Sequence, residues 1–175
     1  AEDGMRDKLV TGVQTCALPI LSSSSRKQEG TIPLNLADPA SIRDFFDLAD
    51  AKSGGKSSEV FLPGAMTHVD RCEEEPELCR RINEEGPALV AEECKRRGHK
   101  LTFISSEYVF GEAEYHGGVI GPFSEEDEPA PSCFYGRSKL AAEKHIEHIF
   151  GKNGALLIRT TMVFSWAPSG NNLDR

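Results

Sequence analysis

Two residues in the second half of the chain have the spacing and chemistry of a proton-transfer pair. Tyr135 and Lys139 are four positions apart, so on a helix they share one face. A phenol next to a fixed ammonium ionises more readily, because the positive charge favours the phenolate. The hydroxyl of Ser106, about thirty residues earlier, could bind the same substrate oxygen. These three groups are suited to proton transfer on a carbonyl or alcohol.

The pattern Tyr-x-x-x-Lys is not specific alone, because many helices contain it by chance. Two flanking stretches strengthen the interpretation. The segment 101–110 is an apolar, partly β-branched run containing Ser-Ser, which predicts a buried strand that delivers hydroxyls to the carboxyl edge of a sheet. An acidic, proline-containing loop, 121–131, then leads into the Tyr135 helix.

This order of motifs resembles the extended short-chain dehydrogenase/reductase family, in its dTDP-4-dehydrorhamnose reductase-like branch. There ISTDYVFDG, PY-E-D-P-P and YGRSKLAGE follow one another, and here they stand as ISSEYVFGE, PFSEEDEPAP and YGRSKLAAE. The resemblance runs from about Leu21 to the C-terminus and includes segments 64–70, 75–78 and 159–164. It implies a Rossmann-type enzyme that reduces or rearranges a nucleotide-linked sugar with NADP(H) or NAD(H).

Strands and helices are expected to alternate, which implies an α/β fold with a doubly wound parallel sheet and right-handed crossovers. Asp38 followed by Pro39 predicts a helix start, and Gly86-Pro87 should interrupt a helix over 76–97. The expected strands are 31–36, 60–62, 101–105 and 156–161, and residues 21–26 are expected to hold the tail of an earlier strand followed by a polar loop. The other expected helices are 39–50 and 138–150. The apolar side of the first helix is predicted to be Ile42, Phe45, Phe46 and Leu48.

A fold of this type should begin with a strand and a glycine-rich turn that binds the pyrophosphate, yet the sequence contains no G-x-G-x-x-G or G-x-x-G-x-x-G. The string VTGVQTCALPI at 10–20 resembles a translated sequencing-library adapter. We therefore expect residues 1–20 to be a non-native segment. Residues 21–175 would then be an incomplete NAD(P)-binding Rossmann domain, lacking the first strand-turn-helix and the C-terminal substrate portion. The alternative takes 8–12, KLVTG, as a degenerate first strand and turn, although Pro19 would break the following helix.

The resemblance also implies residue roles. Ser106, Tyr135 and Lys139 are the expected catalytic residues, with Lys139 lowering the pKa of Tyr135 and binding the ribose. The expected cofactor-binding residues are Arg26, Asn35, Leu36, Gly64, Ala65, Ser105, Tyr135 and Lys139. The expected substrate contacts are Glu107, Tyr108, Val109 and Thr161. Glu107 stands where the family often has Asp, and Asn83 resembles a helix asparagine that braces the neighbouring strand.

The expected cofactor is NADP, because Arg26 follows the second strand where a 2′-phosphate would lie, although NAD and a solvated basic turn stay open. We expect a fragment of an enzyme that reduces a nucleotide-linked 4-keto-6-deoxy sugar. Epimerase or dehydratase chemistry is an alternative, and so is a regulatory role like that of the methionine adenosyltransferase beta subunit. Retention of all three catalytic residue types favours the enzyme.

Composition narrows the partners further. The formal net charge of −8 and the absence of a basic stripe argue against nucleic acid, and no apolar run is long enough for a membrane span. The five cysteines form no C-x-x-C pair, so a cytoplasmic protein with reduced thiols is expected. His145, His148 and their glutamate neighbours fit a solvated helix face better than a metal site, so no metal is expected. A homodimer is left open.

The missing glycine-rich turn leads to a prediction for this chain. It should bind NADPH weakly or not at all in isothermal titration, and deletion of residues 1–20 should leave the melting temperature unchanged or raise it. A micromolar dissociation constant, or a large fall in melting temperature after the deletion, would contradict this interpretation of the N-terminal segment.

Overall fold

Parallel strands and the helices between them form the part of the chain that the computed structural model describes, residues 21–23, 31–111 and 123–161. The strands are β1 (Leu21–Ser23), β2 (Thr31–Pro33), β3 (Glu59–Leu62), β4 (Lys100–Ser106) and β5 (Leu156–Thr160). The helices are α1 (Pro39–Ser53), α2 (Val69–Glu74), α3 (Pro76–Arg80), α4 (Gly86–Arg97) and α5 (Phe134–Phe150). A π-helical turn, η1 (Arg81–Glu85), joins α3 to α4, and a 3₁₀ turn, η2 (Glu107–Val109), follows β4. The predicted α/β class is confirmed.

The larger sheet has the order β3-β4-β5, and all of its pairs are parallel. β4 lies in the middle, where both edges are paired, and its Leu101 and Phe103 are buried. This position explains the continuous apolar run seen in the sequence. Ser106 pairs in register with Thr160, so the carboxyl ends of β4 and β5 meet at one edge of the sheet. β1 and β2 pair in a separate, smaller parallel sheet.

Helix α1 begins as the sequence predicts. The Asp38 carboxylate accepts a hydrogen bond of 2.9 Å from the backbone N–H of Ala40, and Pro39 occupies the first turn. Ile42, Phe45 and Phe46 are buried, but Leu48 is 52% exposed, so its assignment to the apolar side was wrong. The buried stripe continues to Ala49 instead, because i, i+3, i+4 and i+7 share one helix face.

The predicted interruption of the helix over 76–97 is confirmed, and it takes the form of the π-helical turn η1 directly before Gly86 and Pro87. Proline lacks the N–H that would continue the α-helical hydrogen bonds, which accounts for a break at this point. Gly86 also meets a steric constraint. A Cβ atom there would lie 2.5 Å from the carbonyl oxygen of Leu36, so the loop after β2 can approach the helix only at a glycine.

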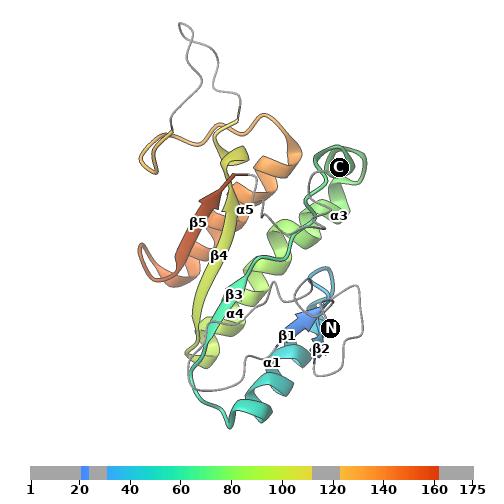
Figure 1. Ribbon diagram of the computed structural model, residues 1–175, viewed down its shortest axis with the longest axis vertical. Helices are drawn as coiled ribbons and strands as arrows, with labels where there is room; N and C mark the ends of the chain where they lie inside the picture. Colours follow the sequence, from blue (N-terminus) through green and yellow to red (C-terminus); the bar gives the residue numbers. More distant parts are fainter. Residues whose placement is uncertain (1–20, 24–30, 112–122, 162–175) are drawn as a thin grey trace, which may run out of the picture.

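Figure 1 shows α4 and α5 alongside the larger sheet, with α1 next to the smaller one. The main hydrophobic core lies between these elements and includes Phe46, Val90, Phe103 and Ile146. A second, smaller cluster contains Met66, Cys72, Cys79 and Tyr135. Helix α5 therefore contributes to both clusters, because Ile146 and Tyr135 belong to it.

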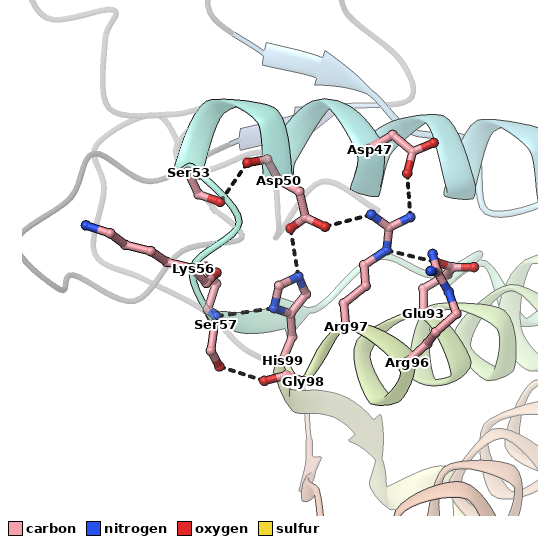
Figure 2. A network of polar contacts seen from close by, with 11 residues as sticks. Asp47, Asp50, Ser53, Lys56, Ser57, Glu93, Arg96, Arg97, Gly98 and His99 are labelled. Atoms are coloured by element: carbon pink, nitrogen blue, oxygen red, sulfur yellow. Dashed lines mark hydrogen bonds and ion pairs between the residues drawn. The ribbon is translucent and has the colours of Figure 1, made fainter.

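A polar network joins α1 to the end of α4 and the start of β4 (Figure 2). Arg97 donates hydrogen bonds of 2.6 Å to Asp50, 2.6 Å to Asp47 and 2.9 Å to Glu93. His99 lies 3.1 Å from Asp50 through its Nε2 atom. Partial burial acts to raise the pKa of Asp50, but the hydrogen bonds and charges of Arg97 and His99 hold it below its ordinary value.

This network predicts different losses for two neighbouring arginines. Arg97 is only 11% exposed and has three carboxylate partners, whereas Arg96 is 62% exposed and pairs with Glu93 alone. In urea unfolding we expect Arg97→Met to cost about 2–4 kcal/mol, because it leaves partly buried carboxylates unpaired. Arg96→Met is the matched control and should cost under about 1 kcal/mol.

The loss caused by Arg97→Met should also depend on pH. The folded-state pKa values of Asp50 and Glu93 are lowered, so the stability that their pairing provides is present at neutral pH and is lost as the pH falls through those values. The difference between wild type and Arg97→Met should therefore shrink in acid. Equal losses for the two arginine variants at pH 7 would contradict this assignment.

Candidate active site

Ser106, Tyr135 and Lys139 meet at the carboxyl end of β4. β4 ends at Ser106, and the first turns of α5 present Tyr135 and Lys139 on one face. The ammonium of Lys139 donates a hydrogen bond of 2.6 Å to the backbone carbonyl of Ile104, two residues before the serine. A hydrogen bond with the Ser106 hydroxyl influences the Tyr135 phenol. The structure therefore brings together the three residues that the sequence singles out.

Lys139 is a buried cation with a well-defined environment. Its side chain is 2% exposed, and its Nζ atom lies 4.1 Å from the centre of the Phe103 ring. Burial lowers the pKa of Lys139 to about 8, while the charges of Glu143 and Cys79 act in the opposite direction. The ring and the Ile104 carbonyl both favour the protonated form. At pH 7 the residue is therefore mostly an ammonium.

Tyr135 behaves differently from the expectation. Burial raises its pKa above the ordinary value of 10, the hydrogen bond with Ser106 acts to lower it, and the Glu107 charge raises it again. The expected lowering by Lys139 is therefore not found in this structure. The physical reason is that burial outweighs it, with the ammonium directed at the Ile104 carbonyl. At neutral pH Tyr135 is a protonated phenol, the form of a general acid.

Ser106 is engaged by its neighbour Glu107. The serine hydroxyl donates a hydrogen bond of 2.9 Å to the Glu107 carboxylate and accepts one of 3.3 Å from the backbone N–H of Tyr108. A serine hydroxyl has a single proton to donate. Glu107 and an ionised Tyr135 therefore compete for that proton, and only its donation to Tyr135 lowers the pKa of the phenol. The longer glutamate side chain thus has a direct contact with a catalytic candidate, which the sequence alone did not predict.

The expected substrate contacts differ in accessibility. Tyr108 is 43% exposed, and its ring meets that of Tyr135 edge to face at 5.5 Å between centroids. Thr161 is exposed and directly follows β5, at the same sheet edge as Ser106. Val109, however, is fully buried, because η2 turns its side chain into the protein. The expected substrate contact of Val109 stays a prediction, since Ser106, at 6% exposed, is buried in this structure as well.

Besides Tyr135 and Lys139 on α5, the expected cofactor residues lie after β2, after β3 and within β4, and Arg26 is outside the described residues. Asn35 shapes the turn before α1, since its side-chain oxygen accepts a hydrogen bond of 3.0 Å from the backbone N–H of Ala37. Leu36 packs against the main core. Gly64 is exposed and Ala65 is half-buried, both directly after β3. The Ser105 hydroxyl is buried and has no hydrogen-bond partner within the described part of the chain.

Asn83 holds the segment after β3 in place. It is fully buried, accepts a hydrogen bond of 2.8 Å from the backbone N–H of Met66 and donates one of 3.0 Å to the Met66 carbonyl. Its amide also contacts the Ser138 hydroxyl, on α5, at 3.3 Å. The bracing geometry implied by the resemblance is thus present. In the sequence Asn83 is surrounded by charged residues over 80–85, so the family resemblance was the available signal.

Two further residues that the sequence analysis did not single out position the start of α5. The Glu73 carboxylate, from α2, accepts a hydrogen bond of 2.6 Å from the backbone N–H of Phe134. A Cβ atom at Gly136 would lie 2.3 Å from the Tyr108 carbonyl oxygen, so a glycine is needed for α5 to approach η2. The glycine within Tyr-Gly-x-x-Lys was a visible signal, whereas the Glu73 contact depends on the tertiary fold.

Searches for two other kinds of site were negative within the described residues. No group of three or more histidine, cysteine, aspartate or glutamate side chains there is arranged to bind a metal ion. No helix among those residues is long and apolar enough to cross a membrane.

The sequence and the structure were compared with known proteins. Residues 9–174 match the family described as the RmlD substrate binding domain. The chain is 33% identical over 131 residues to a dTDP-4-dehydrorhamnose reductase of Mycobacterium tuberculosis, with 74% of this chain and 42% of that protein covered.

Two solved structures agree with this match. A hypothetical dTDP-4-dehydrorhamnose reductase from Sulfolobus tokodaii has a TM-score of 0.64 at 31% identity, with 80% of this chain and 45% of that one covered. The dTDP-4-dehydrorhamnose reductase of Bacillus anthracis, solved with NADP, has a TM-score of 0.60 at 25% identity, with 78% and 46% covered. The chain thus spans less than half the length of these three relatives.

The contacts of Tyr135 lead to a prediction that needs no substrate. In a background where Tyr108 and Tyr115 are phenylalanine, ultraviolet titration reports Tyr135 alone. Ser106→Ala should raise the pKa of Tyr135 further, and Glu107→Gln should lower it, because these neighbours act in opposite directions. Glu126→Gln, in an exposed loop, is the control and should have no effect. Shifts of the same sign for the two test variants would contradict the described geometry.

Proposed function

We propose, for a chain that belongs to the RmlD substrate binding domain family of extended short-chain dehydrogenases/reductases, that the complete protein is an NAD(P)-dependent sugar-nucleotide reductase. Here the complete protein means this chain together with the additional sequence that its longer relatives contain. The observation that carries the proposal is the convergence of Ser106, Tyr135 and Lys139 at the end of β4. Named relatives with reductase activity support it.

The residues at this edge fit a dinucleotide cofactor. The buried Ser105 hydroxyl has no partner among the described residues, and such groups usually have one. A Cβ atom at Gly64 would contact only the Leu36 side chain, at 3.4 Å, which is an ordinary van der Waals distance. The packing of the chain itself therefore does not require a glycine at this position. Close approach of a ligand would require it. NADP is the proposed cofactor, because the Bacillus anthracis relative was solved with it.

When bound, NADPH would supply a hydride to the keto carbon of the sugar. The protonated Tyr135 would donate its phenolic proton to the oxygen of that carbon as negative charge develops there. Lys139 would provide a nearby positive charge and hydrogen bonds to the ribose. Ser106 would orient the substrate oxygen once its proton is released from Glu107. Each of these groups lies on a regular element or at its end, which limits its movement.

The named relatives favour reduction over the alternative chemistries, because two of them are dTDP-4-dehydrorhamnose reductases. A reductase needs the tyrosine as an acid, whereas an epimerase or dehydratase that first oxidises its sugar needs it as a base. Tyr135 can take the acid role, since burial favours the protonated phenol. We propose a nucleotide-linked 4-keto-6-deoxy sugar as the substrate, with Glu107, Tyr108 and Thr161 at the same edge as its contacts. A cytoplasmic location is proposed with it, since the four cysteines of the described residues are free thiols.

Substitutions in the complete protein test this function. Tyr135→Phe should lower kcat about 10²–10⁴-fold, because it removes the proton donor and keeps the ring volume. Lys139→Met should lower kcat and also weaken NADPH binding, and Ser106→Ala should have a smaller effect. His148→Gln, exposed on the same helix, is the control. The assay follows NADPH oxidation with a dTDP-linked 4-keto-6-deoxy sugar.

The same assay can reject the mechanism. If Tyr135→Phe retains activity within a few-fold of wild type, the phenol is not the acid. A regulatory role for the complete protein would then be favoured over the reductase.

A further inference from the structure

Glu143 is a buried carboxylate that the proposed mechanism does not use. It lies on α5, four residues after Lys139, so the two side chains share one face of the helix. Its side chain is 3% exposed, and isolated ionised carboxylates are strongly disfavoured at such positions. A buried charge that persists needs a partner and a reason for its position.

The partner of Glu143 is Arg159, on the neighbouring strand β5. The guanidinium donates hydrogen bonds of 3.1 and 3.2 Å from Nε, and one of 2.7 Å from its terminal nitrogen, to the two carboxylate oxygens. This is the bidentate geometry that gives the stronger arginine–carboxylate pairs. Arg159 stands directly opposite Ser105 in the register of β4 and β5, next to the serines of the candidate site.

Arg159 in turn contacts the segment that follows the catalytic serine. Its guanidinium lies 4.9 Å from the centre of the Phe110 ring, and Phe110 stacks on Phe123 at 4.9 Å with an interplanar angle of 6°. Phe110 comes directly after η2, the turn that begins beside Ser106. A continuous set of contacts therefore runs from the catalytic helix through β5 to the loop beyond Ser106.

The charges around Lys139 make Glu143 important for its ionisation. Lys139 faces Glu143 on its own helix and the Cys79 thiol from α3, and both favour the ammonium against the effect of burial. Arg159 faces Glu143 from β5 and is itself influenced by Glu147 and Glu125. Glu143 is therefore the carboxylate whose charge acts on both cations, Lys139 and Arg159.

From this geometry we propose that Glu143 is a positioning residue that keeps Lys139 charged and, through Arg159 and Phe110, fixes the loop after the catalytic serine. The proposal rests on the proposed function in assigning Lys139 a role in cofactor binding. The carboxylate makes no contact with the reacting atoms in this account. Glu143 acts through the charge of Lys139 and through the orientation of Arg159.

The proposal has consequences of opposite sign for two substitutions. The pKa of Lys139 is about 8, so removal of the Glu143 charge should move it lower, by about one pH unit for a close opposite charge. Arg159→Gln leaves Glu143 unpaired and removes a nearby cation, so it should move the pKa of Lys139 higher. Glu147→Gln is the matched control, because it removes the same charge from an exposed position on the same helix.

Chemical unfolding measured as a function of pH reports the protonation of Lys139 without any ligand. The folded-state pKa of Lys139 lies below its ordinary value of 10.5, so the unfolded state binds more protons between these values. Unfolding free energy should therefore rise with pH from about 8 to 10.5, and Lys139→Met should remove that rise. In Glu143→Gln the rise should begin at lower pH, and in Arg159→Gln at higher pH.

The second measurement is NADPH affinity of the complete protein between pH 6 and 10, roughly the range that brackets this titration. In wild type we expect the affinity for NADPH to weaken above about pH 8, where Lys139 loses its proton. In Glu143→Gln the same weakening should begin at a pH about one unit lower. Glu143→Asp should restore much of the wild-type profile. If Glu143→Gln does not fold, Arg159→Gln provides the test alone.

The outcomes separate the two proposals. Unchanged titration of Lys139 in both Glu143→Gln and Arg159→Gln would overturn the inference about Glu143. Shifts of the expected signs in unfolding, with no NADPH binding by any variant or by wild type, would support that inference and overturn the proposed cofactor role of Lys139.

Discussion

The burial of the Lys139 ammonium at the end of the central strand is the constraint on which the rest of the site depends. An ammonium inside a protein is costly unless its surroundings compensate for the lost water. Here the Ile104 carbonyl, the Phe103 ring and the charge of Glu143 provide that compensation. Ile104 and Phe103 belong to β4, and Glu143 belongs to α5. The ammonium can therefore be buried in this position only when β4 and α5 are packed together. Tyr135, one turn earlier, is fixed by the same packing.

Tight backbone approaches allow these elements to come so close. Gly136 lets the start of α5 approach the turn after Ser106, and Gly86 lets α4 approach the loop after β2. Asn83 connects the loop after β3 to the catalytic helix through Met66 and Ser138. Three segments that would contact a nucleotide and its sugar are therefore held against one another by a few short contacts. The same packing buries Tyr135, and that burial raises the pKa of its phenol.

Much of this arrangement could be predicted from the sequence, because it depends on local patterns. The cap at Asp38, the interruption at Gly86 and the alternation of strands with helices follow from residue types and their spacing. The burial of Val109, the exposure of Leu48 and the Glu107 contact to Ser106 could not be predicted, because they depend on how a turn or helix is rotated against its neighbours. The pKa of Tyr135 was wrongly predicted, since spacing on a helix says nothing of burial.

A structure of the complete protein with NADP and a dTDP-linked 4-keto-6-deoxy sugar would show directly whether Tyr135 is placed to act as the acid. We expect the sugar's keto oxygen to lie within hydrogen-bonding distance of the Tyr135 hydroxyl, about 2.6–3.2 Å, and the Lys139 ammonium to contact the cofactor. A keto oxygen bound away from Tyr135, with the cofactor remote from Lys139, would contradict this mechanism.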